Sequence, residues 1–376
     1  MGGNAFSATL PTTVFPRIPP KAYHALKLRI SAKIKTLYAV VSTPAEAPEK
    51  LDHGDLDLLV CEPFSGNEVP HEEVQALLGA TYVVPAPGNR TSSYAIRIEQ
   101  GDWAGNESEE QQARQLAEGQ DIFYQVDVHV CADKAEWERI HFFHAYGDLG
   151  MILGLLVRTQ GLALGTKGLK APNVPHAPFD LSDSMDEIIA YMGLSMERWR
   201  AGFATKREVF EWVATSTFFD PTTFRAESHG IKKVKPGRKM YAEFAVWAVA
   251  QRDDMSMGAA RARTLMSREA RREHALRRFG KWDEYERIRR EDAHRELIKT
   301  SWNGTKVREW TGIPVHCWQD VKRLMTEVRA ELGGDEGIVL LLEAEGEDAL
   351  KAAVLRIWEK SQVEIAASAM QDTHIG

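Results

Sequence analysis

The sequence predicts an α+β protein in which strands and helices mix early in the chain and helices dominate later. Residues 1–133 contain several short apolar runs of strand length, some of which alternate apolar and polar positions. From Lys134 onward nearly every apolar pattern has helical spacing. The 376 residues, 44% hydrophobic and 27% charged, are enough for more than one domain. We therefore expect a first domain over 1–133, a helical domain over 134–330 and a small segment over 331–376 that packs on the helical domain.

The first part of the chain is predicted to hold two helices and four strands. A helix over residues 21–37 is indicated by Tyr23, Leu26 and Ile30 at helical spacing, and a shorter one by residues 71–78, which end before Gly79. The Glu- and Gln-rich residues 99–121 have few large apolar side chains and are predicted to form an exposed acidic insertion. Strands are expected over 55–61, 81–87, 92–98 and 121–132.

The second part is predicted to be helical almost throughout. Residues 137–161 have the pattern of one long helix or two, and residues 183–193 have a Ser/Asp start and a Gly stop. The tail offers a strand or buried segment over 337–346, followed by a helix. Further helices are expected over 196–203, 205–219, 238–251 and 348–360.

Charge and cysteine content narrow the class of protein. The net charge of −7 is mild and does not indicate a nucleic-acid binder by itself. The three cysteines are far apart and have no metal-binding spacing, which favours free thiols and an intracellular compartment, cytoplasmic or nuclear. We find neither an apolar run of about 18 residues nor a signal peptide, so we expect no membrane partner. The sequence does not indicate an oligomeric state.

The most informative stretch is HGDLDLLV, in which Asp55 and Asp57 stand two residues apart in an apolar run. In a strand both side chains point to the same face, where two negative charges repel each other and resist burial. A divalent cation between them removes that cost, and hard carboxylate ligands suit Mg²⁺ or Mn²⁺. Asp127, in the later strand-like run QVDVHV, supplies a third ligand. Three carboxylates can hold the two metal ions of a phosphoryl transfer site, and one of them can also accept the proton of the attacking hydroxyl.

This order of features resembles the DNA polymerase beta-like nucleotidyltransferase superfamily. Its pattern is a Gly-Gly or Gly-Ser near a helix start, an apolar–Asp–x–Asp–apolar strand and a later strand with a third Asp. The likeness covers about the first 160 residues. It implies a mixed-sheet nucleotidyltransferase core followed by a helical domain that closes the nucleotide cleft. It also implies that Gly2, Gly3 and Ser7 grip the nucleotide phosphates, with Asp148 in the cleft.

Two features depart from the superfamily pattern. Gly2 and Gly3 stand at the start of the sequence, with no preceding element to fix them, and about fifty residues separate them from Asp55, so a helix and a linker have been inserted.

The reaction expected is transfer of a nucleoside monophosphate from an NTP, such as ATP, to an acceptor hydroxyl. The acceptor is expected to be an RNA 3′ end, a small molecule or a protein side chain, and RNA is favoured because residues 252–308 hold 16 Lys or Arg against 10 Asp or Glu. We expect RNA to bind the basic region 261–308, unless those residues form a solvated helix face with i, i+4 pairs. Trp282, Tyr285 and Trp302 either stack on bases or belong to the core.

Two other functions remain open. One is a non-catalytic nucleotide- or RNA-binding module of the same fold, and the other is a metal-dependent phosphohydrolase. His53 and His129 flank the carboxylates and raise a zinc alternative, but their spacing favours structural roles.

Overall fold

The computed structural model describes residues 5–10, 13–85, 90–172, 177–224, 237–251 and 266–372. Gly2 and Gly3, and the start of the basic region at 261–265, lie outside the described residues. The chain divides into two compact units, Met1–Phe279 and Gly280–Gly376.

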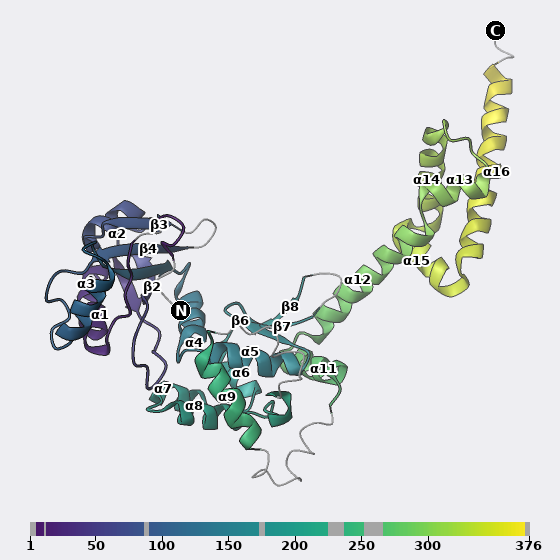
Figure 1. The fold of residues 1–376 in the computed structure, drawn as a ribbon. Helices are drawn as coiled ribbons and strands as arrows, with labels where there is room; N and C mark the ends of the chain where they lie inside the picture. The colour runs from purple at the N-terminus through teal and green to yellow at the C-terminus, as the bar shows by residue number, and fades with distance from the viewer. Residues whose placement is uncertain are drawn as a thin grey trace. The chain divides into compact units, whose positions relative to one another are not determined.

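The first unit contains a five-stranded mixed sheet, built from the N-terminal part of the chain (Figure 1). Its strand order is β1-β2-β5-β4-β3, and only the central pair β2 and β5 is parallel. The predicted α+β class with a mixed sheet is confirmed. The strands are β1 (Tyr38–Ser42), β2 (Leu56–Pro63), β3 (Tyr82–Pro85), β4 (Thr91–Arg97) and β5 (Phe123–Val130).

Each face of the sheet is covered by different helices. Leu56, Leu58 and Val60 of β2 belong to the main core, which α1 (Pro20–Ile34) and α2 (His71–Leu78) complete with residues such as Leu26 and Val74. The alternate residues of β2 point to the opposite face. There Leu59 and Cys61 pack with Cys131 and with Ile140 of α4 (Lys134–His144). This second face is the one that also carries Asp57, two residues before Leu59.

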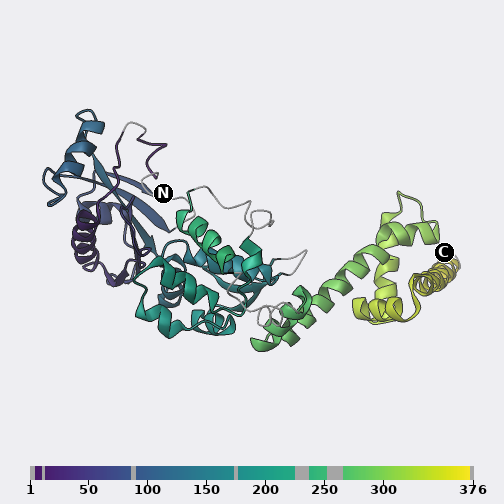
Figure 2. The same ribbon diagram turned by 60° about the horizontal axis from the view of Figure 1, so that its bottom comes forward.

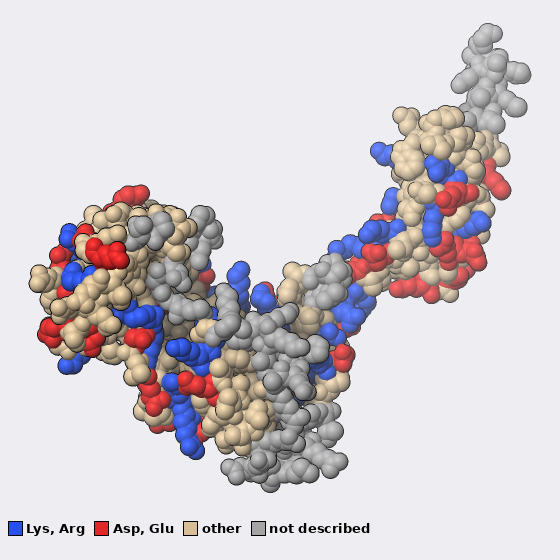
Figure 3. All heavy atoms as spheres, in the orientation of Figure 1, with Lys and Arg blue, Asp and Glu red and all other residues tan. Residues whose placement is uncertain are grey.

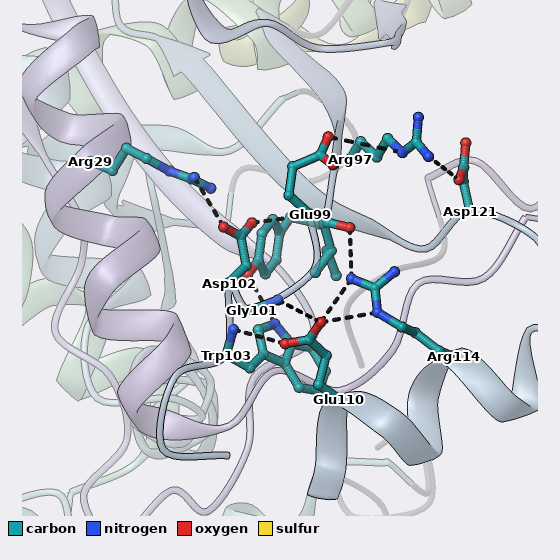
Figure 4. A network of polar contacts seen from close by, with 11 residues as sticks. Arg29, Arg97, Glu99, Gly101, Asp102, Trp103, Glu110, Arg114 and Asp121 are labelled. Carbon is teal, nitrogen blue, oxygen red and sulfur yellow. Dashed lines mark hydrogen bonds and ion pairs between the residues drawn. The ribbon is translucent and has the colours of Figure 1, made fainter. Parts of the chain in front are cut away.

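Most residues of the acidic segment 99–121 are exposed, as expected of an insertion, but Trp103, Glu110, Ala113 and Ala117 are buried. It contains α3 (Glu107–Leu116), and its Trp103 is 1% exposed, with the indole N–H donating to the Tyr124 hydroxyl at 2.9 Å. Buried Glu110 accepts hydrogen bonds from the backbone N–H groups of Gly101 and Trp103 and pairs with Arg114 at 2.8 Å (Figure 4). One large aromatic residue and one internally paired carboxylate therefore anchor a segment whose composition is otherwise polar.

The remainder of the first unit is mostly helical, as expected, but it also contains a small antiparallel sheet that the sequence did not predict. The region predicted as one helix or two is two, α4 and α5 (Leu149–Thr159), which meet at a bend of 91°. Tyr146 and Gly147 stand at that bend with φ of 58° and 69°, outside the helical range. The small sheet has the order β6-β7-β8: β6 (Ala163–Gly165), β7 (Gly168–Ala171) and β8 (Phe179–Ser182).

Four helices that follow in this unit lie within predicted segments: α6 (Met185–Tyr191), α7 (Met196–Ala201), α8 (Lys206–Ala214) and α9 (Lys239–Ala250). The 3-10 turn η1 (Pro221–Phe224) and α11 (Arg268–Arg278) lie outside the predicted helical segments.

The second unit consists of helices around its own core (Figure 2). Residues 337–346, expected as a strand or buried segment, lie within a helix, and Ile338, Val339 and Leu342 on it are buried while Leu340 is 61% exposed. That spacing is helical, and an apolar run of this length fits either type of element. The helices are α12 (Trp282–Ser301), α13 (Gly304–Thr311), α14 (Trp318–Leu332), α15 (Gly334–Glu345) and α16 (Glu347–Asp372).

Within the described ranges, no single helix has both the length and the apolar composition to cross a membrane. Helices α4 and α5 reach that composition only when taken together across their 91° bend.

Candidate metal centre

Three carboxylates from two neighbouring strands meet at one point of the five-stranded sheet. Asp57 of β2 stands directly opposite Asp127 of β5 in the parallel register, and Asp55 precedes β2 by one residue on the same face as Asp57. One ligand oxygen from each of the three side chains lies within 4.8 Å of the other two. The expected meeting of Asp55, Asp57 and Asp127 is therefore observed, and it is the grouping with metal-ligand geometry among the described residues.

The cluster has an electrostatic cost in the absence of a cation. Asp57 is exposed, and Asp55 and Asp127 are half-buried. Partial removal from water, followed by the negative charges of Asp55 and Asp127, raises the pKa of Asp57 to about 7. The pKa of Asp127 is raised to about 6, mainly by burial and then by Asp55, and burial also raises the pKa of Asp55. The protein therefore crowds three acidic groups that would ionise more easily apart.

Polar groups on the same sheet hold Asp127 in place. The Gln125 side-chain amide donates to both carboxylate oxygens of Asp127, at 3.0 and 2.9 Å. The Ser93 hydroxyl, on the facing residue of β4, also hydrogen-bonds to Asp127 and opposes the rise in its pKa. Alternation along β5 puts residue 125 on the face of Asp127, so Gln125 was within reach of sequence reasoning, whereas Ser93 required the antiparallel register.

Cationic side chains oppose the negative charge of the cluster. Lys50, in the segment before β2, partly offsets the rise in the pKa of both Asp55 and Asp57. Arg17 does the same for Asp55. Arg17 is itself held by Asp52, with its Nε atom 2.9 Å from the carboxylate. Nothing in the sequence pattern indicated Lys50, because it belongs to an irregular stretch.

The segment that follows Gly2 and Gly3 is fixed beside β5. The backbone N–H of Ala5 donates to the Gln125 side-chain oxygen at 3.2 Å, and the same Gln125 holds Asp127. Phe6 is fully buried with Ala95 and Phe123, and it stacks on Phe15 at 5.0 Å. Ser7 follows in a turn and is exposed. The chain after the glycine pair is thus anchored in the sheet by an aromatic cluster.

Asp148 has partners away from this cluster. It is buried, and its carboxylate accepts from the Arg238 guanidinium at 3.0 Å and from the backbone N–H of Tyr241 at 3.1 Å. Tyr241 lies in the first turn of α9, whose free N–H groups attract a carboxylate. These contacts tie the start of α5 to the start of α9, and the structure does not bring Asp148 into the carboxylate cluster.

The two histidines near the carboxylates make structural contacts. The buried His53 imidazole stacks on Tyr23 with ring centroids 3.6 Å apart, and its backbone pairs with Ile18. His129 Nδ1 lies 2.8 Å from the Thr91 hydroxyl. Neither belongs to the carboxylate cluster, so its donor set consists of hard oxygens alone.

No protein-family model matches the chain. No curated protein matches it at a significant level either. The class that the fold and site define is therefore an α+β protein whose mixed sheet carries a three-carboxylate cluster able to bind a metal ion. The donor set fits a hard divalent cation, because every ligand oxygen belongs to a carboxylate and the cluster has excess negative charge.

Proposed function

We propose that the protein is a metal-dependent nucleotidyltransferase that moves a nucleoside monophosphate from an NTP to an acceptor hydroxyl. The observation that carries the proposal is the meeting of Asp55, Asp57 and Asp127 on adjacent parallel strands of a mixed sheet. Mg²⁺ or Mn²⁺ is the cofactor proposed, because both prefer carboxylate oxygens and nucleotide phosphates. The resemblance to polymerase beta-like nucleotidyltransferases supports the same reaction.

The chemistry is an in-line displacement at phosphorus. The acceptor oxygen forms a bond to the α-phosphorus of the NTP, the bond from that phosphorus to the bridging oxygen breaks, and pyrophosphate leaves. A divalent cation, when bound, supplies charge neutralisation at the attacking and leaving oxygens. Asp55, Asp57 and Asp127 are the ligands proposed, and one of their oxygens receives the proton of the acceptor hydroxyl. Gln125 and Ser93 orient Asp127.

We assign triphosphate binding to the N-terminal segment with Gly2, Gly3 and Ser7. Support comes from the hydrogen bond between Ala5 and Gln125, which ties the residues after the glycine pair to the side chain that holds Asp127. Glycines permit close backbone approach, and backbone N–H groups bind anions. Asp148 stays a predicted nucleotide contact, although its two observed partners favour a role in fixing α9.

An RNA 3′ end is the acceptor proposed, because the region 261–308 is rich in Lys and Arg. In the described part of that region, however, acidic side chains lie among the basic ones. Lys/Arg and Asp/Glu side chains intermix over α12 (Figure 3), and basic residues pair with acids one turn away, such as Arg277 with Glu273 at 2.9 Å. Tyr285 and Trp302 are 3% and 2% exposed, so both belong to the core, as one of the two sequence interpretations expected.

The test is a transfer assay with labelled NTPs, Mg²⁺ and mixed RNA, run on the wild type and on Asp57→Asn. Label on RNA that disappears in the variant supports the proposal, and Asp180→Asn is the matched control because that carboxylate is 75% exposed in a pair with Lys170. Label on the protein itself would show a protein acceptor. Free phosphate without transfer would indicate a hydrolase, and no turnover with retained NTP binding would indicate a non-catalytic module.

A further inference from the structure

A cavity of about 430 Å³ lies within the first unit, between α4, α7 and the turn from β8 into α6. Its volume is in the range of small-molecule sites. Its walls combine four aromatic rings with five charged side chains. It is not part of the carboxylate cluster, because none of Asp55, Asp57 and Asp127 lines it.

The aromatic side of the cavity is one continuous set of rings. Trp137 and His141 stack with centroids 5.1 Å apart, His141 meets Trp199 edge-on at 6.2 Å, and Phe142 lies 4.8 Å from Trp199. The Trp137 indole N–H donates to the Leu59 carbonyl at 3.3 Å, which fixes that ring against β2. Burial lowers the pKa of His141, so its imidazole is neutral at physiological pH. The wall therefore consists of packed aromatic rings without a positive charge of their own.

The charged side of the cavity has one carboxylate in excess. Arg139 pairs with Asp183 at 3.1 Å, and Arg200 pairs with Asp186 at 2.7 Å, so both guanidinium groups are already neutralised. The Glu138 carboxylate forms neither a hydrogen bond nor an ion pair with any residue in the described ranges. The lining thus has a net charge of −1 when His141 is neutral.

We propose that this cavity binds an organic cation through an alkylammonium group placed between the aromatic wall and the Glu138 carboxylate. The electron-rich faces of Trp rings attract cations, and quaternary alkylammonium groups such as that of choline suit such walls because they have no N–H group to donate to water. An anionic ligand would have to separate the pairs of Arg139 and Arg200. A neutral planar ligand would leave Glu138 without a counter-ion. The proposal does not depend on the carboxylate cluster or on nucleotidyl transfer.

The test uses isothermal titration calorimetry of the full chain with choline chloride, in EDTA and without nucleotide. The reference ligands are 3,3-dimethyl-1-butanol, the neutral isostere of choline, and adenosine, a neutral planar ligand. We expect choline to bind about 3- to 30-fold more tightly than its neutral isostere, the range that cation–π attraction supplies. Equal affinity for the two isosteres, tighter binding of adenosine or no binding of choline would each overturn the proposal.

Variants locate the binding site. Glu138→Gln is expected to weaken choline binding about 5-fold, the size of one charge interaction at a solvated site. Glu197→Gln, an exposed carboxylate on α7 outside the cavity lining, is the matched control and should leave the affinity unchanged. Trp199→Leu should weaken choline binding further. If that variant does not fold, the comparison of Glu138→Gln with Glu197→Gln decides, and equal affinities in those two variants contradict the proposed site.

Discussion

Replacing Asp57 by Asn tests the carboxylate cluster through the stability of the metal-free protein. In the folded protein the pKa of Asp57 is raised to about 7, above its ordinary value of 3.8, by partial removal from water and by the charges of Asp55 and Asp127. A raised pKa means that the folded state prefers the protonated carboxyl. The wild type is therefore expected to keep its full stability below about pH 4 and to lose part of it as the pH rises through 7. Asn at position 57 does not ionise, so the stability of the variant does not fall for this reason as the pH rises.

The size of the effect follows from the spacing of the three oxygens. Two ionised carboxylates 4.8 Å apart repel by about 1–2 kcal/mol at an effective dielectric constant of about 40–80, which suits a cluster whose Asp57 is exposed. The neutral amide of the variant would remove the repulsion with both neighbours. We expect Asp57→Asn to be more stable than the wild type by about 1–3 kcal/mol at pH 8 and equally stable at pH 4.

The assay is thermal unfolding in EDTA and in Mn²⁺, between pH 4 and 8. Each kcal/mol corresponds to about 2–4 °C in Tm for a unit of this size. Mn²⁺ should reverse the order of stability, because it stabilises the wild type by about 2.7 kcal/mol at 100 times its Kd and the variant far less. Asp180→Asn should match the wild type throughout. The reasoning is refuted if Asp57→Asn is less stable than the wild type at pH 8 in EDTA, or if Mn²⁺ stabilises both proteins equally.

Three further changes have distinct expected outcomes. Gln125→Met removes both hydrogen bonds from the Gln125 amide to Asp127 and leaves that of Ser93, so the Mn²⁺ affinity measured by calorimetry should fall about 10-fold. An unchanged affinity would show that Gln125 does not orient a ligand. Glu110→Gln weakens a buried, multiply bonded carboxylate whose pKa is lowered by Arg114 and two backbone N–H groups against the effect of burial. At pH 7 the free energy of unfolding of the variant should be about 1–3 kcal/mol lower than that of the wild type. The difference should shrink as the pH falls below 4.5, the ordinary pKa of the group, because protonation removes the same contribution from the wild type. Chemical denaturation at two pH values measures this difference. Asp148→Asn breaks the ion pair with Arg238, so it should lower the free energy of unfolding by about 1–3 kcal/mol and leave the Mn²⁺ and NTP affinities constant. Lost NTP binding at full stability would instead support the predicted nucleotide contact.

The carboxylate cluster could be predicted from the sequence because its pattern lies within two short segments. Two aspartates at strand spacing inside an apolar run favour a cation site, because their charges repel and resist burial, and a third in another apolar strand completes the set. Which strands would be neighbours was not visible in either run. The parallel register that puts Asp57 opposite Asp127 is a long-range feature that neither run shows, and Asp127 was expected near the pair only because a metal site needs a further ligand.

Three features of the fold could not be predicted from the sequence. In the first, the average composition of a segment does not show that one or two of its residues are buried. The acidic residues 99–121 have the composition of a solvated loop and most are exposed, yet buried Trp103 and the bonded carboxylate of Glu110 anchor the segment to the core. Residues 337–346 form an apolar run short enough for a strand, and the helix there became visible only from which positions are buried. The strands of the small sheet are only three or four residues long, too short to show a period.

Anomalous diffraction from crystals grown with Mn²⁺ and a non-hydrolysable NTP tests the central claim most directly. The account predicts a manganese peak within coordination distance, about 2.0–2.6 Å, of carboxylate oxygens from Asp55, Asp57 and Asp127. A saturating Mn²⁺ concentration with no peak there, or with the ion bound only by other side chains, would contradict it.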